Sequence, residues 1–157
     1  FAETARAVAH TRGATIVLTG SAGDRAIVDA VARALRDVPT IDLSGQVDLV
    51  TLAALLAELD VLITGDTGPM HLAAAVGTPV VALFGPSNPM RYGPLTRTQR
   101  VLRVDLPCSP CGQVRLPPER CRGHVPDCLD GISVERVVAA ALELLDLRAA
   151  ASGKALV

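Results

Sequence analysis

The residues best suited to chemistry lie in one short segment, Thr64 to His71, which reads Thr-Gly-Asp-Thr-Gly-Pro-Met-His. Its two glycines let the backbone approach a ligand closely, and free N–H groups at a helix start favour an anion such as a diphosphate. Thr67 and His71 add a hydroxyl and a ring N–H that donate to phosphate oxygens. Asp66 repels phosphate, so we expect it to hold the turn or to meet a sugar hydroxyl. The alternative is an ordinary strand–helix connection capped by Asp66.

Two other turns follow predicted strands. Residues 84–89, Phe-Gly-Pro-Ser-Asn-Pro, open at the same edge of the predicted sheet, so their small and polar groups are candidates to line the same cleft. An ordinary turn is the alternative interpretation. Residues 20–24, Gly-Ser-Ala-Gly-Asp, come after an earlier strand, and their local sequence favours a helix start with Asp24 in the first turn.

The four cysteines are clustered: two residues separate Cys108 from Cys111, and Cys121 and Cys128 lie further along the chain. The Cys-x2-Cys spacing lets two thiolates share one metal ion, and His124 is a substitute ligand. The pattern predicts a structural zinc site that ties down the loop. Free thiols, two disulfides or an iron–sulfur cluster are the alternatives. We expect no catalytic metal here, because four protein ligands leave no open position.

The 84–89 turn is followed by Arg91, Tyr92 and Arg97, whose side chains are within reach of a phosphate or an acceptor. A solvated loop face is the favoured interpretation for them. His10 is expected on the surface of a helix, and we assign it no role.

The spacing of apolar residues predicts the elements that position these motifs. The clearest unit is a strand–helix–strand motif, with a strand at 60–64, a turn at 65–68, a helix at 69–76 and a strand at 80–84. Pro69 suits the first turn of a helix, where its missing N–H is no loss. The other predicted helices cover residues 2–12, 26–34, 49–59 and 133–147, and the other predicted strands cover residues 14–19, 40–43 and 100–104.

This alternation predicts an α/β fold with a Rossmann-like parallel sheet and helices on both faces. Half of the residues are apolar but only three are aromatic, so Ala, Val, Leu and Ile must build the core. We expect one domain over residues 1–147 that includes a Pro- and Cys-rich loop at 86–128, followed by a frayed tail at 148–157. Eight of the eleven prolines fall in that loop, where they disfavour regular structure.

The charge and hydropathy of the chain exclude some classes of function. The chain of 157 residues has 15 basic and 16 acidic side chains and a net charge of −1, which argues against a nucleic-acid binder. No apolar stretch approaches the ~20 residues that span a membrane, and no signal peptide is apparent. The first residues read as the inside of a helix, so we expect a piece of a longer protein.

Residues 60–86 closely resemble the heptosyltransferases of lipopolysaccharide core synthesis, which form glycosyltransferase family 9. They read DVLITGDTGPMHLAAAVGTPVVALFGP. The strand ends Leu18-Thr19-Gly20 and Leu43-Ser44-Gly45 are similar to the same family, as are Cys108-Ser109-Pro110-Cys111 and the helix start at 132–135. The resemblance covers most of residues 14–147.

The resemblance implies the second, donor-binding Rossmann-like domain of a two-domain GT-B enzyme. It implies that the 66–68 turn and His71 face the diphosphate and sugar of the donor, usually ADP-heptose, and that Asp24 lies near the ribose. The donor-binding residues that it implies are Asp66, Thr67, Gly68, His71, Asp24 and Gly20. The residues expected to line the cleft are Gly65, Pro69, Met70, Gly85, Pro86 and Ser87.

The resemblance also implies an inverting transfer of heptose from ADP to a glycolipid or glycan acceptor of the lipopolysaccharide-core type. The catalytic base and the acceptor site belong to the family's first domain, so we expect no catalytic residue in this chain. We expect no catalytic cofactor and no activity from the chain alone. The expected location is the cytoplasm, at the inner face of the inner membrane, with peripheral membrane contact through that first domain.

Two alternatives to this function stay open. One is a non-catalytic module that binds a nucleotide or a sugar and has a loop held by a metal ion. This alternative would be favoured if no Rossmann-like half with a carboxylate in its donor cleft preceded the chain in the full-length protein. The other is a different GT-B enzyme, such as a nucleotide-sugar epimerase, which would act on a UDP-sugar without any acceptor.

Overall fold

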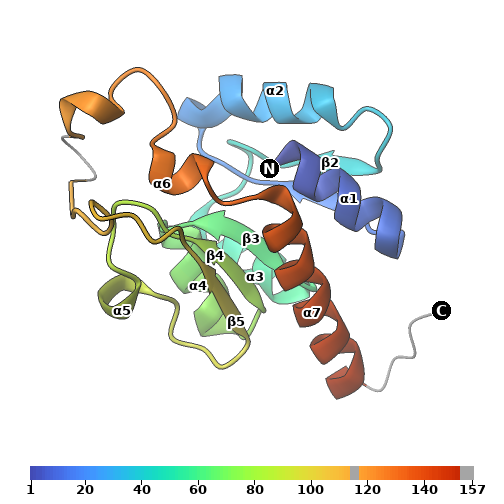
Figure 1. Cartoon of the computed structure of the whole chain (residues 1–157). Helices are drawn as coiled ribbons and strands as arrows, with labels where there is room; N and C mark the ends of the chain where they lie inside the picture. Colours follow the sequence, from blue (N-terminus) through green and yellow to red (C-terminus); the bar gives the residue numbers. More distant parts are fainter. Residues whose placement is uncertain (114–116, 153–157) are drawn as a thin grey trace. The chain divides into compact units, whose positions relative to one another are not determined.

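Short parallel strands alternate with helices along the chain in the computed structural model, which describes residues 1–113 and 117–152 (Figure 1). The chain forms two compact units, Phe1–Ala54 and Leu55–Val157, and each is described by itself. The first unit contains α1 (Ala2–Arg12), β1 (Ile16–Leu18), η1 (Ala22–Asp24), α2 (Arg25–Ala34) and β2 (Thr40–Asp42). Helix α3 (Leu49–Glu58) spans the division between the units.

The first unit is built around a parallel pair, β1 and β2, in which Ile16 lies opposite Thr40 and Leu18 opposite Asp42. Helix α1 ends at Gly13, whose φ of 62° is the left-handed conformation that glycine adopts without strain. Its apolar side packs with the end of α2 in a core of Ala9, Leu35 and Val38. The predicted strands at 14–19 and 40–43 are therefore confirmed, with shorter limits.

The second unit contains a three-stranded parallel sheet in the order β3-β4-β5. Figure 1 shows α7 in front of this sheet and α4 behind it, and both helices contact its strands. The predicted α/β class, with a parallel sheet between helices, is confirmed. The elements are β3 (Leu62–Gly65), α4 (Gly68–Val76), β4 (Val80–Leu83), α5 (Pro89–Tyr92), β5 (Gln99–Leu102), η2 (Glu119–Cys121), α6 (Asp127–Asp130) and α7 (Val134–Ser152).

Strand β4 is the centre of the second unit. Val80, Val81 and Ala82 are fully buried, as is Phe84 just after the strand. A strand covered on both faces needs such a continuous apolar run rather than an alternating one. The hydroxyl of buried Thr78 donates to the carbonyl of Leu56 at 2.5 Å, which satisfies a polar group inside the core.

Helix α4 has the start and end that its sequence predicts. Pro69 lies in its first turn, and Gly77 ends it with a φ of 85°. Met70 and Ala73 are fully buried against the core. The helix predicted at 69–76 is confirmed.

The Pro-rich region at 86–128 contains short elements and is tied to the end of β4. The hydroxyl of Ser109 donates to the carbonyl of Gly85 at 2.7 Å, and the N–H of Gly112 donates to the carbonyl of Pro86 at 2.7 Å. Helix α7 continues to Ser152, beyond residue 147 where the sequence predicts its end.

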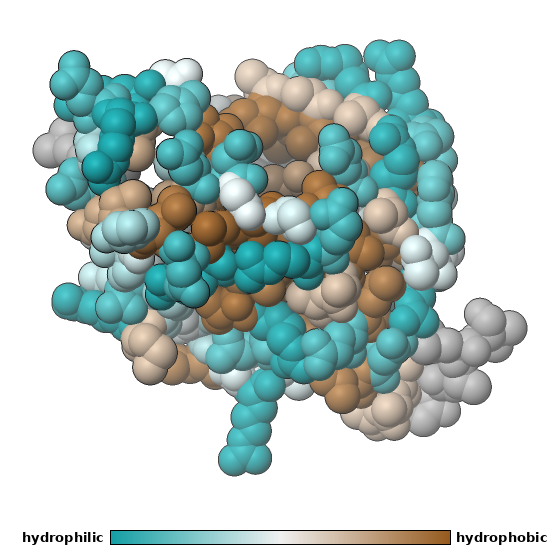
Figure 2. All heavy atoms as spheres, in the orientation of Figure 1, coloured by the Kyte–Doolittle hydropathy of each residue, from teal (hydrophilic) through white to brown (hydrophobic). Residues whose placement is uncertain are grey.

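Figure 2 shows mostly hydrophilic side chains on the face in view, with apolar side chains visible between them.

Gly85 provides a test of how tightly this region packs. A Cβ at Gly85 would lie 2.7 Å from Leu129 Cγ and 3.0 Å from Cys128 Sγ. Gly85→Ala should therefore lower the free energy of unfolding by about 1–3 kcal/mol, the usual cost of overpacking, in a denaturant titration. Gly65→Ala is the matched control, because its Cβ would meet nothing closer than 3.9 Å. Equal stability of the Gly85→Ala variant and the unchanged protein would contradict this packing.

Candidate functional site

The turn at 65–68 lies where β3 ends and α4 begins. Thr67 precedes the helix in an extended conformation, and its side chain makes no hydrogen bond to the first helical N–H groups. The Thr67 hydroxyl lies instead 3.1 Å from the Thr64 hydroxyl. The turn therefore offers the start of α4 to an anion without a side-chain cap, and no acidic residue lies in the first turn of the helix.

The polar side chains of this turn are accessible. His71 and Thr67 are exposed, and Asp66 is partly exposed. Neither the Asp66 nor the His71 side chain has a hydrogen bond or ion pair with any residue in ranges 1–113 and 117–152. Gly68 is exposed as well, with open space where a Cβ would lie. The cap position of α4 is Thr67, so the alternative interpretation, in which Asp66 caps the helix, is wrong.

The predicted cleft-lining residues divide into accessible and buried ones. Gly65, Pro69 and Pro86 are partly exposed. Met70 is fully buried and belongs to the core, because at the third position of α4 it faces inward. Its side chain does not line a cleft, which corrects the prediction for this residue. Gly85 and Ser87 are also buried.

Both turns of the second unit leave the sheet at the same edge. In the parallel register Gly65 lies beside Leu83, so the turn after β3 and the turn after β4 start level with each other. The carboxyl edge of a parallel sheet is where α/β proteins bind ligands. The predicted placement of the 65–68 and 84–89 turns at one edge is confirmed.

Asp24 and Gly20 lie in the first unit. One Asp24 carboxylate oxygen accepts hydrogen bonds from the hydroxyl and the N–H of Ser21, at 2.7 and 2.8 Å. The bond from the Ser21 N–H belongs to a capping box, and the hydrogen bond from the Ser21 hydroxyl is the largest cause of the lowered pKa of Asp24. The helix-start interpretation of residues 20–24 is therefore confirmed, and the contact of Asp24 with a ribose stays a prediction.

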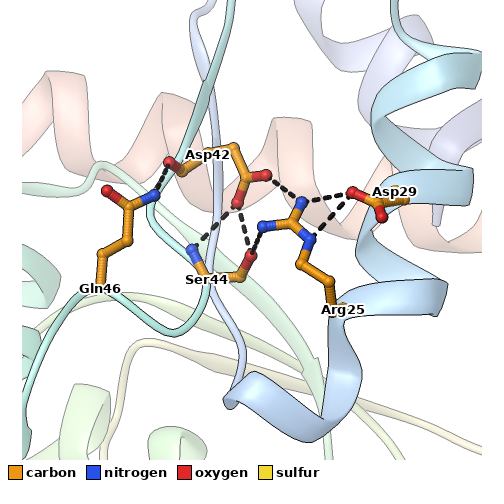
Figure 3. Close-up of polar contacts among 5 residues, drawn as sticks. All are labelled: Arg25, Asp29, Asp42, Ser44 and Gln46. Carbon is orange, nitrogen blue, oxygen red and sulfur yellow. Dashed lines mark hydrogen bonds and ion pairs between the residues drawn. The ribbon is translucent and has the colours of Figure 1, made fainter.

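A network that the sequence analysis missed joins α2 to the end of β2 (Figure 3). The Arg25 guanidinium donates to Asp29 Oδ1 at 2.9 and 2.6 Å, to Ser44 Oγ at 2.8 Å, and to Asp42 Oδ2. The Ser44 N–H and hydroxyl donate to Asp42 Oδ1, at 3.0 and 2.6 Å. Gln46 closes the turn by donating to the Asp42 carbonyl at 2.9 Å.

The network holds the turn after β2 in place beside the turn after β1. The N–H of Gly45 donates to the carbonyl of Gly20 at 2.8 Å. The hydrogen bonds from Ser44 and Arg25 lower the pKa of Asp42 from 3.8 to about 2. Only the four-residue spacing of Arg25 and Asp29 was visible in the sequence, as a helical ion pair.

All four cysteines are free thiols. Cys128 is buried and Cys108 is exposed. The pKa of the Cys128 thiol is raised mainly by its burial and to a smaller extent by the other three cysteines. Within residues 1–113 and 117–152, no group of three or more His, Cys, Asp or Glu side chains is arranged to hold a metal ion. His124 Nε2 lies 3.9 Å from Asp127 Oδ1, which is within ion-pair distance. The structural metal site stays a prediction.

Comparisons with known proteins identify the family. A model of glycosyltransferase family 9 (heptosyltransferase) matches residues 1–119, well over half of the chain. The chain belongs to glycosyltransferase family 9. Lipopolysaccharide heptosyltransferase 2 of Escherichia coli K12 is 37% identical over 95 residues, 59% of this chain and 27% of that protein. Lipopolysaccharide heptosyltransferase 3 of the same strain is 40% identical over 87 residues, 54% of this chain and 25% of that protein.

Two solved structures of the family share the fold. Escherichia coli ADP-heptose lipopolysaccharide heptosyltransferase II gives a TM-score of 0.78 at 30% identity, covering 93% of this chain and 40% of that chain. A family 9 glycosyltransferase from Veillonella parvula gives a TM-score of 0.72 at 32% identity, covering 94% of this chain and 42% of that chain. This family 9 chain thus spans less than half the length of its relatives. No helix among its described residues is long and apolar enough to cross a membrane.

The Arg25 network predicts a pH dependence of stability. The lowered pKa of Asp42 means that its stabilising effect is complete above pH 3.8 and is lost as the pH falls through about 2. Arg25→Met should therefore unfold at a lower denaturant concentration than the unchanged protein at pH 7, and this difference should shrink toward pH 2. Arg33→Met is the matched control on α2, since Arg33 forms no ion pair with the described residues. A difference that stays constant with pH would contradict the assignment.

The Cys-x2-Cys spacing of the sequence predicts a metal site that the described side chains do not form, and elemental analysis decides between the two. Protein purified without oxygen should contain about one equivalent of zinc or iron, lost when Cys108 and Cys111 are both replaced by Ser. Protein without either metal would remove the structural metal site.

Proposed function

We propose that this chain is the donor-binding part of an inverting glycosyltransferase, which moves heptose from ADP to an acceptor of the lipopolysaccharide-core type. The observation that carries the proposal is the turn at 65–71. It combines an uncapped helix start, an exposed Thr67 and an exposed His71 at the carboxyl edge of a parallel sheet. The similarity to heptosyltransferases, one of them described as an ADP-heptose enzyme, supports the choice of sugar and nucleotide.

The chemistry of the transfer explains why such a turn is useful. An acceptor hydroxyl attacks the anomeric carbon of the sugar, the bond to the diphosphate breaks, and negative charge accumulates on the departing diphosphate. Donors that are already in position when this charge develops stabilise the transition state more than the ground state. The N–H groups at the start of α4 and the ring N–H of His71 are such donors.

The other residues of the turn have supporting roles in this proposal. The Thr67 hydroxyl donates to a phosphate oxygen, and Gly68 leaves room for the diphosphate because its Cβ position is open. Asp66 accepts a hydrogen bond from a sugar hydroxyl, since its carboxylate has no partner among the described residues.

The rest of the enzyme completes the reaction. The match covers only 25–33% of the full length of each curated relative, and we propose that the remaining part of the enzyme supplies the catalytic base and the acceptor site. The whole enzyme then works at the cytoplasmic face of the inner membrane, where a nucleotide sugar and a lipid-linked acceptor meet.

Substitution of His71 tests the proposal. In the enzyme that contains this chain, His71→Ala should lower the rate of ADP-heptose turnover by about 10²–10³, the usual effect of removing one donor to a developing charge. Thr67→Ala should lower it less, since the N–H groups of α4 remain. The measurement is release of ADP in the presence of a lipid-linked acceptor.

A control separates the site from the general presence of histidine. His10→Ala removes another exposed histidine, which lies on α1 near Asp37, and should leave turnover unchanged. Unchanged turnover in both His71→Ala and Thr67→Ala would show that the donor diphosphate binds elsewhere. Turnover of a UDP-sugar without any acceptor would contradict the proposed transfer.

A further inference from the structure

An unusual set of apolar side chains projects from the segment that follows β4. Met90 and Leu95 are 93% and 94% exposed, and Tyr92 is 44% exposed. Single exposed apolar residues are common on proteins. Three of them within six residues, two almost completely in water, form an apolar tip. Figure 1 places α5 at the lower left, and Figure 2 shows apolar side chains exposed there beside hydrophilic ones.

The segment of the chain that carries this tip is basic. No Asp or Glu occurs from Thr67 to Val104, whereas the segment contains four arginines. Arg100 pairs with Glu143, and Arg103 pairs with Asp105 at 2.8 Å. Arg91 and Arg97 form no ion pair with any described residue, and the Arg91 guanidinium lies 5.2 Å from the centre of the Tyr92 ring. Two cations without acidic partners therefore flank the apolar tip.

The segment is held in shape rather than loosely attached. The Asn88 side chain caps α5 by accepting from the Met90 N–H at 2.9 Å, and the Gly93 N–H donates to the Pro89 carbonyl at 2.8 Å. Pro94 is buried. The side chains of Met90, Arg91 and Leu95 border a hollow of about 490 Å³ next to the start of β5. The apolar tip and its cations are thus presented together on a preformed surface.

We propose that the surface formed by Met90, Arg91, Tyr92, Leu95 and Arg97 docks on a membrane that contains anionic phospholipids. Arginine side chains pair with lipid phosphates, and apolar side chains flanked by cations enter the boundary between headgroups and acyl chains. Tyr92 suits the same boundary because its ring is apolar and its hydroxyl is polar. The inference places a membrane contact in this chain, and it does not depend on the identity of the donor.

Vesicle binding tests this surface in the whole enzyme. The unchanged enzyme should co-sediment with phosphatidylcholine vesicles that contain phosphatidylglycerol and much less with pure phosphatidylcholine. Two double variants, Arg91→Gln with Arg97→Gln and Met90→Ser with Leu95→Ser, should each weaken binding about tenfold or more. Raising the salt concentration should weaken binding of the unchanged enzyme and of the apolar variant more than that of the arginine variant.

A matched control and a separate measurement complete the test. Arg120→Gln with Val125→Ser changes one exposed arginine and one exposed apolar residue of the same unit and should bind like the unchanged enzyme. Circular dichroism establishes that each variant is folded, and ADP affinity is measured separately, so a failure of the donor proposal is distinguishable. Failure of the unchanged enzyme to bind anionic vesicles, or an equal loss in the control variant, would overturn the inference.

Discussion

The parallel pairing of β3 with β4 is the constraint on which the candidate site depends. Two parallel neighbours cannot be joined by a tight turn, so the chain must cross back through a helix, and that helix is α4. The start of α4 therefore lies at the carboxyl end of β3. The same pairing brings the turn after β4 level with it. A ligand at this edge meets a helix start and two turns that are fixed by the sheet.

Packing around β4 gives this arrangement its rigidity. Residues 80–82 of the strand and Phe84 are fully buried, and Gly85 follows the strand in a position too crowded for a side chain. The turn at 65–68 is different, because Thr67 is exposed, Asp66 is partly exposed, and the Asp66 carboxylate has no partner among the described residues. The second unit thus combines a rigid scaffold with an accessible turn, which is what a site for a charged, transient ligand requires.

Much of the fold was predictable from the sequence because the signals are local. Buried parallel strands are continuous apolar runs such as residues 80–84, and Pro69 and Gly77 mark both ends of α4. The prediction for Met70 was wrong, because Pro69 is partly exposed and His71 is exposed, and only the helical phase turns Met70 inward. The Arg25 network was missed because Arg25 and Asp42 are distant in sequence and meet only when β1 and β2 pair. The geometry of the four cysteines depends on the path of an irregular loop, which no periodicity describes.

The accessible turn and the rigid sheet together predict where the diphosphate of the donor lies. A crystal structure of the enzyme with ADP bound tests this most directly. The account predicts diphosphate oxygens within hydrogen-bond distance of the Gly68 N–H and the His71 ring, at the start of α4. A diphosphate bound away from residues 65–71 would contradict it.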